Sequence, residues 1–379
     1  MSVPDWPTSY GYNMFFFPVS KWIGGIFYEH SHRLVASTVG LLTAILALWL
    51  WARETTGTAR RHGILAIVGV LLIVGGMMGV RKTPVFVSIA LAGFGGIIFG
   101  IFQIKRTSGL RWFGIVALSA VILQGVLGGL RVTQMKDEIG IFHATIAQLF
   151  FLFLAVITLF TTKFWNNLNI AAVCDRHGDS EKKATVTDRR YSKIRNFCVA
   201  TTGLILCQLV LGATMRHQHA GLAIPDFPLA YGKIWPALDV QSIERYNRAR
   251  AEVVGVFPIT ASQIVLQMVH RLMALAITIH VFIVAIRSQR TLGWQNWLTR
   301  GAWIWLLLIA IQFSLGIATV LTGKSADIAT AHVAFGALSL VCGGLISILS
   351  FRLLAVPAAK TETAKNEMTS FAASSTIAR

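Results

Sequence analysis

The chain alternates between long apolar runs and short polar segments. A transmembrane helix needs about 20 consecutive, mostly apolar residues, and nine runs meet or approach that length. They predict spanning helices at residues 30–51, 63–80, 84–104, 112–130, 139–162, 196–215, 261–286, 301–321 and 328–352. Because only helices and closed barrels satisfy the backbone inside lipid, the pattern predicts an all-α, polytopic membrane protein.

Composition agrees with this class. Of the residues, 55% are hydrophobic and 13% are charged, whereas about 25% are charged in an average soluble domain. The formal net charge of +18 would suggest nucleic acid as the partner of a soluble protein. Here the basic residues stand in short clusters between apolar runs, so we expect contact with membrane lipids and none with nucleic acid. No CxxC spacing occurs among the cysteines, which argues against a disulfide framework or a thiolate metal site: Cys174, Cys198, Cys207 and Cys342.

The loops between the predicted helices differ in basic charge. One alternate set, together with the C-terminal tail, holds 21 Lys and Arg residues, and the other set holds 11. Cytoplasmic loops carry the excess of Lys and Arg. We therefore expect a multi-pass protein of the cell inner membrane, with the N-terminus and the long 216–260 loop outside and the C-terminus in the cytoplasm.

An internal repeat organises the chain. Residues 3–11 read VPDWPTSYG and residues 224–232 read IPDFPLAYG. A helix follows each of them, with the sequence HRLVA from His32 and HRLMA from His270. These paired motifs indicate two copies of one structural unit.

A second paired motif lies further along each copy. The pattern Gln-x-x-Leu-Gly begins at Gln124 and again at Gln312. A histidine follows 19 or 20 residues later, at His143 and at His332, near the start of another predicted helix. The predicted units are an N-terminal repeat at 1–162, a cytoplasmic linker at 163–195, a C-terminal repeat at 196–355 and a cytoplasmic polar tail at 356–379.

The two copies are unequal. His32 and His143 are 111 residues apart, whereas His270 and His332 are 62 apart, and a predicted helical hairpin at about 62–105 accounts for most of the difference. Copy two also opens with a helix that carries Gln-x-x-Leu-Gly from Gln208, and its counterpart would fall before residue 1. We therefore expect roughly 25 to 40 further residues upstream, with one spanning helix. The alternative is that the inserted hairpin takes the place of that helix.

Histidines are the first candidates for chemistry. Ionisable side chains within a span are costly, about 2.5 to 3.5 kcal/mol for the charged types, so each is a functional candidate. A single histidine in a helix is equally well a packing residue. Four at repeat-equivalent places favour bis-imidazole ligation of haem iron between helices, with His32 paired to His143 and His270 to His332.

Charged residues accompany these histidines. Glu29 precedes His32 by three residues and so shares its helix face, while copy two has Gln267 at that place. The glutamate is either an acid favoured by the helix dipole or a group for proton transfer or charge stabilisation. Arg33 and Arg271 directly follow a ligand histidine, and they either snorkel to the headgroups or pair with haem propionates.

These residues together resemble the haem A synthase family. The motifs that carry the resemblance are EHSHR at residues 29–33, HRLMA at 270–274, the repeated PDWP and PDFP, and the repeated Gln-x-x-Leu-Gly. The resemblance implies two four-helix bundles, each holding a haem through two histidines. It implies that Glu29 is needed for turnover. His32 and His143 would hold haem O as substrate, and His270 and His332 a resident haem b.

The same resemblance implies an oxidoreductase. The reaction is oxidation of the C8 methyl group of haem O to a formyl group by successive hydroxylation, which provides haem A for cytochrome oxidase. Candidate partners are haem O synthase and cytochrome oxidase assembly proteins. The chain departs from the family by lacking its first helix and any cysteine before Cys174.

Two other classes of function stay open. One is a two-haem membrane electron-transfer protein without haem-modifying activity, although such a protein has no need for an acid in only one copy. The other is a transporter built on internal repeats, which does not by itself call for four histidines at matched depth.

Overall fold

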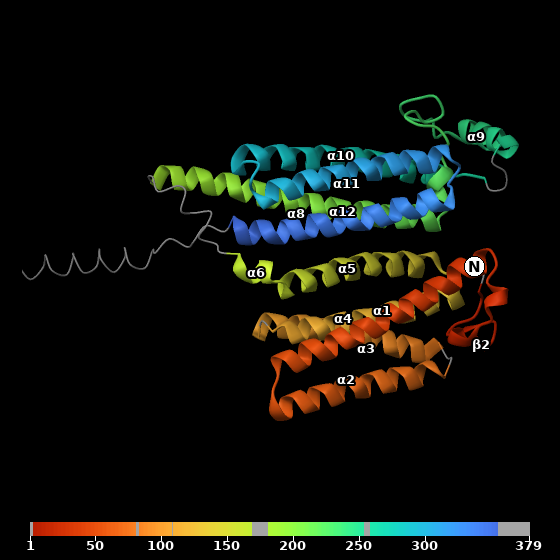
Figure 1. The fold of residues 1–379 in the computed structure, drawn as a ribbon. Helices are drawn as coiled ribbons and strands as arrows, with labels where there is room; N and C mark the ends of the chain where they lie inside the picture. Colours follow the sequence, from red (N-terminus) through yellow and green to blue (C-terminus); the bar gives the residue numbers. More distant parts are fainter. Residues whose placement is uncertain (1–2, 81–82, 108, 169–180, 254–257, 355–379) are drawn as a thin grey trace, which may run out of the picture.

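The computed structural model describes residues 3–80, 83–107, 109–168, 181–253 and 258–354. Within them, nine helices are long and apolar enough to cross a membrane, and each coincides with a predicted span (Figure 1). The all-α, polytopic prediction is therefore confirmed. The predicted tail at 356–379 lies outside the described residues.

The spanning helices are α1 (Gly25–Glu54), α2 (Gly57–Met78), α3 (Thr83–Thr107), α4 (Leu110–Gln134), α5 (Asp137–Thr161), α8 (Glu181–His217), α10 (Ala261–Leu292), α11 (Trp297–Leu321) and α12 (Ala326–Leu353). The shorter elements are strands β1 (Thr8–Ser9) and β2 (Tyr12–Asn13), the 3-10 turns η1 (Met14–Phe16), η2 (Val19–Lys21) and η3 (Ala220–Leu222), and helices α6 (Lys163–Asn167) and α9 (Val240–Val253). Strands β1 and β2 pair antiparallel.

Side chains close the helix ends where backbone groups lack intrahelical partners. Thr260 and Gln263 form a reciprocal capping box at the start of α10. The carboxylate of Glu54, at the end of α1, accepts the backbone N–H groups of Leu110 and Arg111, each at 2.9 Å. Because the N-terminus of a helix favours negative charge, this contact fastens the end of α1 to the start of α4.

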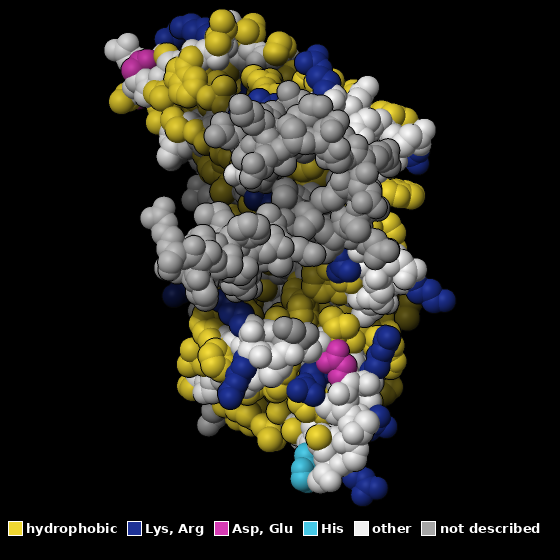
Figure 2. Space-filling view, turned by 90° about the vertical axis from the view of Figure 1, so that its left-hand side faces the viewer, with side chains coloured by type: hydrophobic (Ala, Val, Ile, Leu, Met, Phe, Trp, Pro, Cys, Tyr) yellow, Lys and Arg dark blue, Asp and Glu magenta, His cyan; other side chains and the backbone are white. Residues whose placement is uncertain are grey.

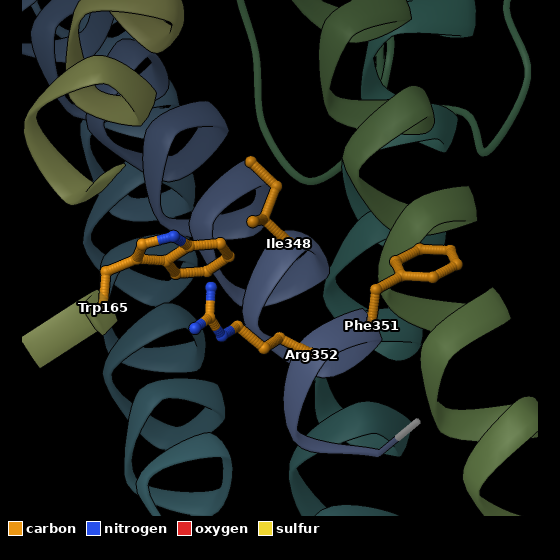
Figure 3. A pocket seen from close by; sticks show the side chains of 4 residues that line it. All are labelled: Trp165, Ile348, Phe351 and Arg352. Carbon is orange, nitrogen blue, oxygen red and sulfur yellow. The ribbon is translucent and has the colours of Figure 1, made fainter. Parts of the chain in front are cut away.

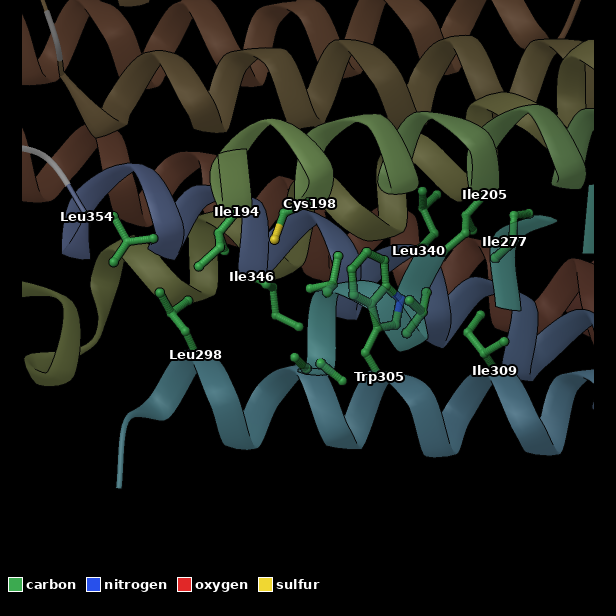
Figure 4. Packing of buried hydrophobic residues seen from close by; sticks show 14 of the residues in the cluster. Ile194, Cys198, Ile205, Ile277, Leu298, Trp305, Ile309, Leu340, Ile346 and Leu354 are labelled. Carbon is green, nitrogen blue, oxygen red and sulfur yellow. The ribbon is translucent and has the colours of Figure 1, made fainter. Parts of the chain in front are cut away.

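The second copy forms a closed four-helix bundle. Helix α8 packs against α10 and α12, and α11 packs against the same two helices. Its core surrounds Trp305, which is fully buried and donates its indole N–H to the carbonyl of Ser339 at 2.9 Å. Ile205, Leu340 and other aliphatic side chains pack around that ring (Figure 4).

Within the described residues, the first copy contains the counterparts of only three of these helices. Helix α4 packs against both α1 and α5, but α1 and α5 do not form a packed pair among the described residues. Helix α3 packs on α4, while α2 packs on α1 and α3. The inserted hairpin therefore lies on the outside of α1 and α4 (Figure 1) and does not stand between α1 and α5, where the alternative reading would put it.

Glycines explain why α3 docks on α4. A Cβ added at Gly96 would lie 2.4 Å from Oγ of Ser119, and one at Gly100 would lie 2.4 Å from Cγ2 of Val116. Small residues spaced by one helical turn allow two membrane helices to approach closely. This contact positions the hairpin on the face of α4 that α1 and α5 do not use.

Two segments differ from their prediction. The 216–260 stretch, expected as a loop, contains helix α9, which begins where Asp239 accepts the N–H of Ser242 at 2.9 Å. Tyr246 of α9 stacks on Tyr231 with ring centroids 3.6 Å apart. Helix α8 begins at Glu181, inside the segment predicted as a linker, although its spanning part starts at Tyr191.

The two bundles lie side by side because α5 packs against α8 and α12 (Figure 1). One end of the pair carries β1, β2 and α9, and is called the loop end here. The opposite end, called the basic end, shows Lys and Arg side chains around an apolar surface with few acidic ones (Figure 2). This distribution is the one from which the sequence predicted the cytoplasmic side.

Candidate functional site

All four candidate histidines lie at the loop end. His32, His143, His270 and His332 each fall within the first three turns of a helix, in α1, α5, α10 and α12 respectively. The first two therefore belong to one bundle and the last two to the other. The histidines of the two copies therefore lie at similar depths from the loop end.

Two of the Gln-x-x-Leu-Gly segments hold the backbone of a histidine. The side-chain amide of Gln124 in α4 donates to the carbonyl of His143 at 2.8 Å. The amide of Gln208 in α8 donates to the carbonyl of His270 at 2.9 Å. Sequence reasoning used these motifs only to identify the repeat, and the structure adds their contact with the histidines.

The third segment meets its histidine through the ring. Nδ1 of His332 lies 3.1 Å from the backbone carbonyl oxygen of Gln312, and Nε2 of the same ring lies 3.5 Å from the Gln312 amide nitrogen. A backbone carbonyl that accepts from Nδ1–H fixes the tautomer, so Nε2 carries the lone pair and faces the Gln312 amide. The segment thus orients the ring of His332.

The glycine that ends each motif makes room for an imidazole. A Cβ added at Gly128 would lie 3.1 Å from Cε1 of His143, and one at Gly316 would lie 3.1 Å from Cε1 of His332. At Gly212, the corresponding distance to His270 is 3.4 Å. Glutamine and glycine are four residues apart, so they share one helix face and contact the same histidine.

His32 differs from the other three histidines. No Gln-x-x-Leu-Gly segment of the described residues faces it, and its side chain is exposed while theirs are partly buried. It still interacts electrostatically with His143, as His270 does with His332. The first copy therefore places its two histidines close enough to interact, and leaves His32 exposed.

The polar atoms around these rings fit a haem. Nδ1 of His143 and Nδ1 of His270 are buried without a hydrogen-bond partner, as are the side-chain oxygens of all three motif glutamines, Gln124, Gln208 and Gln312. No group of three or more His, Cys, Asp or Glu in the described chain could hold a metal ion. A planar cofactor that needs only two imidazoles suits this donor set better than a metal ion held by protein alone.

Arginine fastens the loop over each bundle. Arg33 donates to the carbonyls of Val3, Asp5 and Thr8 at 3.0, 2.7 and 2.8 Å. We call residues 3–11 the PDWP loop. Arg33 is buried, with 8% of its surface exposed, so it does not snorkel to the headgroups. Its pairing with a haem propionate remains a prediction.

The second copy repeats this arrangement. Arg271 donates to the carbonyls of Ile224, Asp226 and Leu229 at 3.4, 2.7 and 3.0 Å. These three residues occupy the same places in residues 224–232, the PDFP loop, as Val3, Asp5 and Thr8 do in the PDWP loop. Both loops are thus held by the residue that directly follows a candidate ligand histidine.

Glu29 and Gln267 make the same contact with these loops. Oε2 of Glu29 accepts the backbone N–H of Val3 at 3.1 Å, and its Oε1 lies 3.2 Å from Arg33. Oε1 of Gln267 accepts the N–H of Ile224 at 2.6 Å. The carboxylate therefore has a structural use that an amide also fulfils.

An aspartate closes each loop. Asp5 accepts the N–H groups of Tyr10 and Gly11 at 2.7 and 2.8 Å and the hydroxyl of Thr8 at 2.6 Å. Burial raises the pKa of Asp5, but the hydrogen bonds from Gly11, Thr8 and Tyr10 outweigh that effect and leave its pKa below the ordinary value. Asp226 accepts the N–H groups of Tyr231 and Gly232, the corresponding residues of the PDFP loop, at 2.9 and 3.0 Å.

The copies differ at a buried pair beneath the loop. In copy one, Oγ of Ser9 lies 3.1 Å from Nδ1 of His30, and both residues are fully buried. The equivalent residues of copy two are Ala230 and Met268, which belong to one apolar cluster. A polar pair in one copy thus replaces an apolar pair in the other.

Arg131 is a further residue that sequence reasoning did not single out. It lies three residues after Gly128 and so shares the helix face that meets His143. It interacts electrostatically with both His32 and His143. It also interacts electrostatically with Arg216 and Glu29. The spacing from the motif was the signal that would have identified it.

A separate hollow lies at the basic end, away from the histidines. Trp165, Ile348, Phe351 and Arg352 line it (Figure 3). The Arg352 guanidinium stacks over the Trp165 ring, 4.0 Å from its centroid, which is a cation–π contact that anchors α6 to α12. The hollow shares no lining residue with the histidine pairs.

Fold and site together define a polytopic membrane protein that is built from two copies of one helical unit, each copy with a histidine pair. The sequence profile of the family described as cytochrome oxidase assembly protein matches residues 84–343, more than half of the chain. The chain belongs to this family. The matched range includes His143, His270 and His332, whereas Glu29 and His32 precede it.

Several relatives carry the name haem A synthase. One from Anaplasma marginale is 30% identical over 222 residues, which make up 58% of this chain and 55% of the relative. One from Rhizorhabdus wittichii is 28% identical over 258 residues, which make up 65% of this chain and 65% of the relative. One from Halalkalibacterium halodurans is 23% identical over 80% of this chain and 73% of its own. The chain thus spans about half the length of the Anaplasma relative.

Proposed function

We propose that the chain is a haem A synthase, which oxidises the C8 methyl group of haem O to a formyl group. The observation that carries this proposal is the repetition of one histidine pair in both bundles of a member of this family. The name of its relatives supports it. The reaction proceeds by successive hydroxylation of the methyl group to a gem-diol, which loses water, and an external oxidant takes up the four electrons that the carbon loses.

The two bundles take different roles in this proposal. His32 and His143 hold haem O as substrate, and the exposure of His32 is consistent with a ligand that enters and leaves. His270 and His332 hold a resident haem b within the closed bundle. Haem b supplies one-electron redox chemistry when bound.

Charged residues at the loop end complete the substrate site. Glu29, one turn before His32, is the proposed group for proton transfer or for stabilising positive charge that develops on the substrate. Arg131 is a candidate partner for a carboxylate of the substrate, since a guanidinium binds a carboxylate in two places and this one interacts with both His32 and His143.

Orientation and partners belong to the same proposal. The basic end faces the cytoplasm and the loop end faces outward across the cell inner membrane, which the distribution of Lys and Arg supports. Haem O synthase, which would supply the substrate, and cytochrome oxidase assembly proteins, which would receive the product, are the candidate partners.

One observation favours the electron-transfer alternative. Because Glu29 holds the backbone of Val3 as Gln267 holds Ile224, an acid in only one copy does not by itself require chemistry at that place. Variants that separate binding from turnover distinguish the two functions.

The test uses ligand variants in membranes of cells that make haem O. His143→Ala should abolish haem A formation while the low-spin spectrum of haem b persists, and His270→Ala should remove that spectrum. His280→Ala is the matched control, because His280 bonds its own helix through the carbonyl of Ala276 and belongs to neither pair. Loss of haem A only in the His280 variant, or in none, would contradict the assignment.

A further inference from the structure

We propose that each Gln-x-x-Leu-Gly segment is a docking module that sets the position and rotation of one ligand imidazole. The module consists of its glutamine and its glycine, which are positioning residues and not ligands. This inference rests on the haem ligation in the proposed function. It assigns a role to Gln124, Gly128, Gln208, Gly212, Gln312 and Gly316.

The three modules share one arrangement of glutamine, glycine and histidine. In all three modules, the glutamine and the glycine lie one turn apart on the same face of a helix, and that face meets a histidine of a neighbouring helix. The side-chain amides of Gln124 and Gln208 donate to the backbone carbonyls of their histidines at 2.8 and 2.9 Å. In the third module, the backbone carbonyl of Gln312 lies 3.1 Å from Nδ1 of His332, and its side-chain amide lies 3.5 Å from Nε2. The glycine leaves 3.1 to 3.4 Å between its missing Cβ and Cε1 of the ring. One module therefore fixes both the height and the rotation of the imidazole.

The module glutamines place buried polar groups inside the bundles. A glutamine amide inside a membrane bundle is costly to bury unless hydrogen bonds satisfy it. The three module glutamines are of this kind, and each retains a side-chain oxygen without a partner, as Gln148 of α5 also does. Packing alone would favour an aliphatic side chain at these places. Selection of glutamine is explained if the amide must hold a histidine, because partners behind a ligand strongly influence how it binds iron.

Other glycines of the same helices have more space around them. A Cβ added at Gly125 in α4 or Gly203 in α8 would meet nothing within 4 Å. At Gly301 in α11 it would meet only the Ile346 side chain, at 3.4 Å. Gly129 of α4 also approaches a ring, that of Trp6. Among the glycines of α4, α8 and α11, however, only the module glycines approach a histidine ring, and the others provide a matched control on each helix.

The experiment compares Gly316→Ala with Gly301→Ala in the full-length protein. An added Cβ at residue 316 forces the His332 ring to move by a few tenths of an ångström. We expect the low-spin electron paramagnetic resonance signal of haem b to shift and its retention during purification to weaken about tenfold. The Gly301→Ala protein should keep the wild-type signal and haem content.

A second pair tests the other bundle. Gly128→Ala should change the signal of the haem that His143 holds and leave the signal of the second bundle unchanged, which also shows that the variant folds. Gly125→Ala should change neither. The effect of Gly212→Ala should be weaker than that of Gly316→Ala, because 3.4 Å is an ordinary contact distance.

The outcomes separate this inference from the proposed function. Identical haem signals in the Gly316, Gly128 and control variants, with haem present in each, would overturn the docking role and leave haem binding intact. A wild-type protein that holds no haem would contradict the proposed function, and the docking role with it. A signal that changes equally in module and control variants would also overturn the docking role.

Discussion

The carboxylate of Glu29 accepts the backbone N–H of Val3 at 3.1 Å, across the start of α1. Its repeat equivalent makes the same bond with an amide in place of the carboxylate, at 2.6 Å. The residue proposed for chemistry is therefore also part of the fastening of the PDWP loop. Any substitution at this place tests both roles unless the new side chain keeps the hydrogen bond.

Glu29→Gln separates the two roles. The amide oxygen can accept from Val3 as Gln267 accepts from Ile224, so the loop and the haem content should be nearly unchanged. Formation of haem A should stop, because an amide neither transfers a proton nor carries negative charge. The measurement is haem content and haem A yield in the same membranes, with Glu29→Ala as the variant that loses both roles. A wild-type yield of haem A from Glu29→Gln would remove Glu29 from the mechanism.

Arg271→Ala should loosen the PDFP loop. The variant removes three hydrogen bonds from a charged donor to loop carbonyls. Bonds to charged groups contribute about 1.5 to 3 kcal/mol each, so we expect the free energy of loop opening to fall by at least about 2 kcal/mol. That change corresponds to roughly 30-fold faster hydrogen exchange at the amides of Tyr231 and Gly232. Arg248→Ala, at an exposed position of α9, is the control, and equal exchange in both variants would contradict the fastening role.

The polar pair beneath the PDWP loop should behave as a coupled unit. Ser9→Ala leaves Nδ1 of His30 buried without its partner, and His30→Met leaves the serine hydroxyl in the same state, each at a cost of about 1 to 3 kcal/mol. The double variant reproduces the Ala230 and Met268 pair of copy two and should recover most of that stability. A double-mutant cycle on the thermal unfolding midpoint measures the coupling. Additive losses would show that the two residues act independently.

The sequence predicted the nine spans because their apolar runs are long and the lipid leaves helices as the only local solution. It also indicated the repeat and the places of the four candidate histidines near the starts of their helices; their role as ligands stays a prediction. It missed α9, whose Asp239 cap and spacing of Ile243 and Tyr246 give a short amphipathic signal within a loop. It did not predict that Arg33 binds loop carbonyls, since sequence gives no distance between residue 33 and residues 3–8. The contact of Gly128 with His143 depends on how two helices pack, and the motif alone does not contain that information.

Acid should open the PDWP loop through Asp5. The pKa of this carboxyl in the folded protein lies below its ordinary value of 3.8, so the stability it contributes is fully present above that value. The contribution is lost as the pH falls from about 3.8 through the lower folded pKa. Hydrogen exchange at Tyr10 and Gly11 should accelerate over this range in the wild-type protein and depend little on pH in Asp5→Asn. The same pH dependence in both proteins would assign it to another group.

The most direct test is the mass of the haem extracted from membranes of a host that makes haem O but no haem A, with and without this chain. We expect a haem of the mass of haem A to appear only when the chain is present, and to disappear in the Glu29→Gln variant while haem b persists. If the chain is abundant and holds haem b but only haem O is extracted, the protein carries electrons without modifying haem, and the proposed activity is wrong.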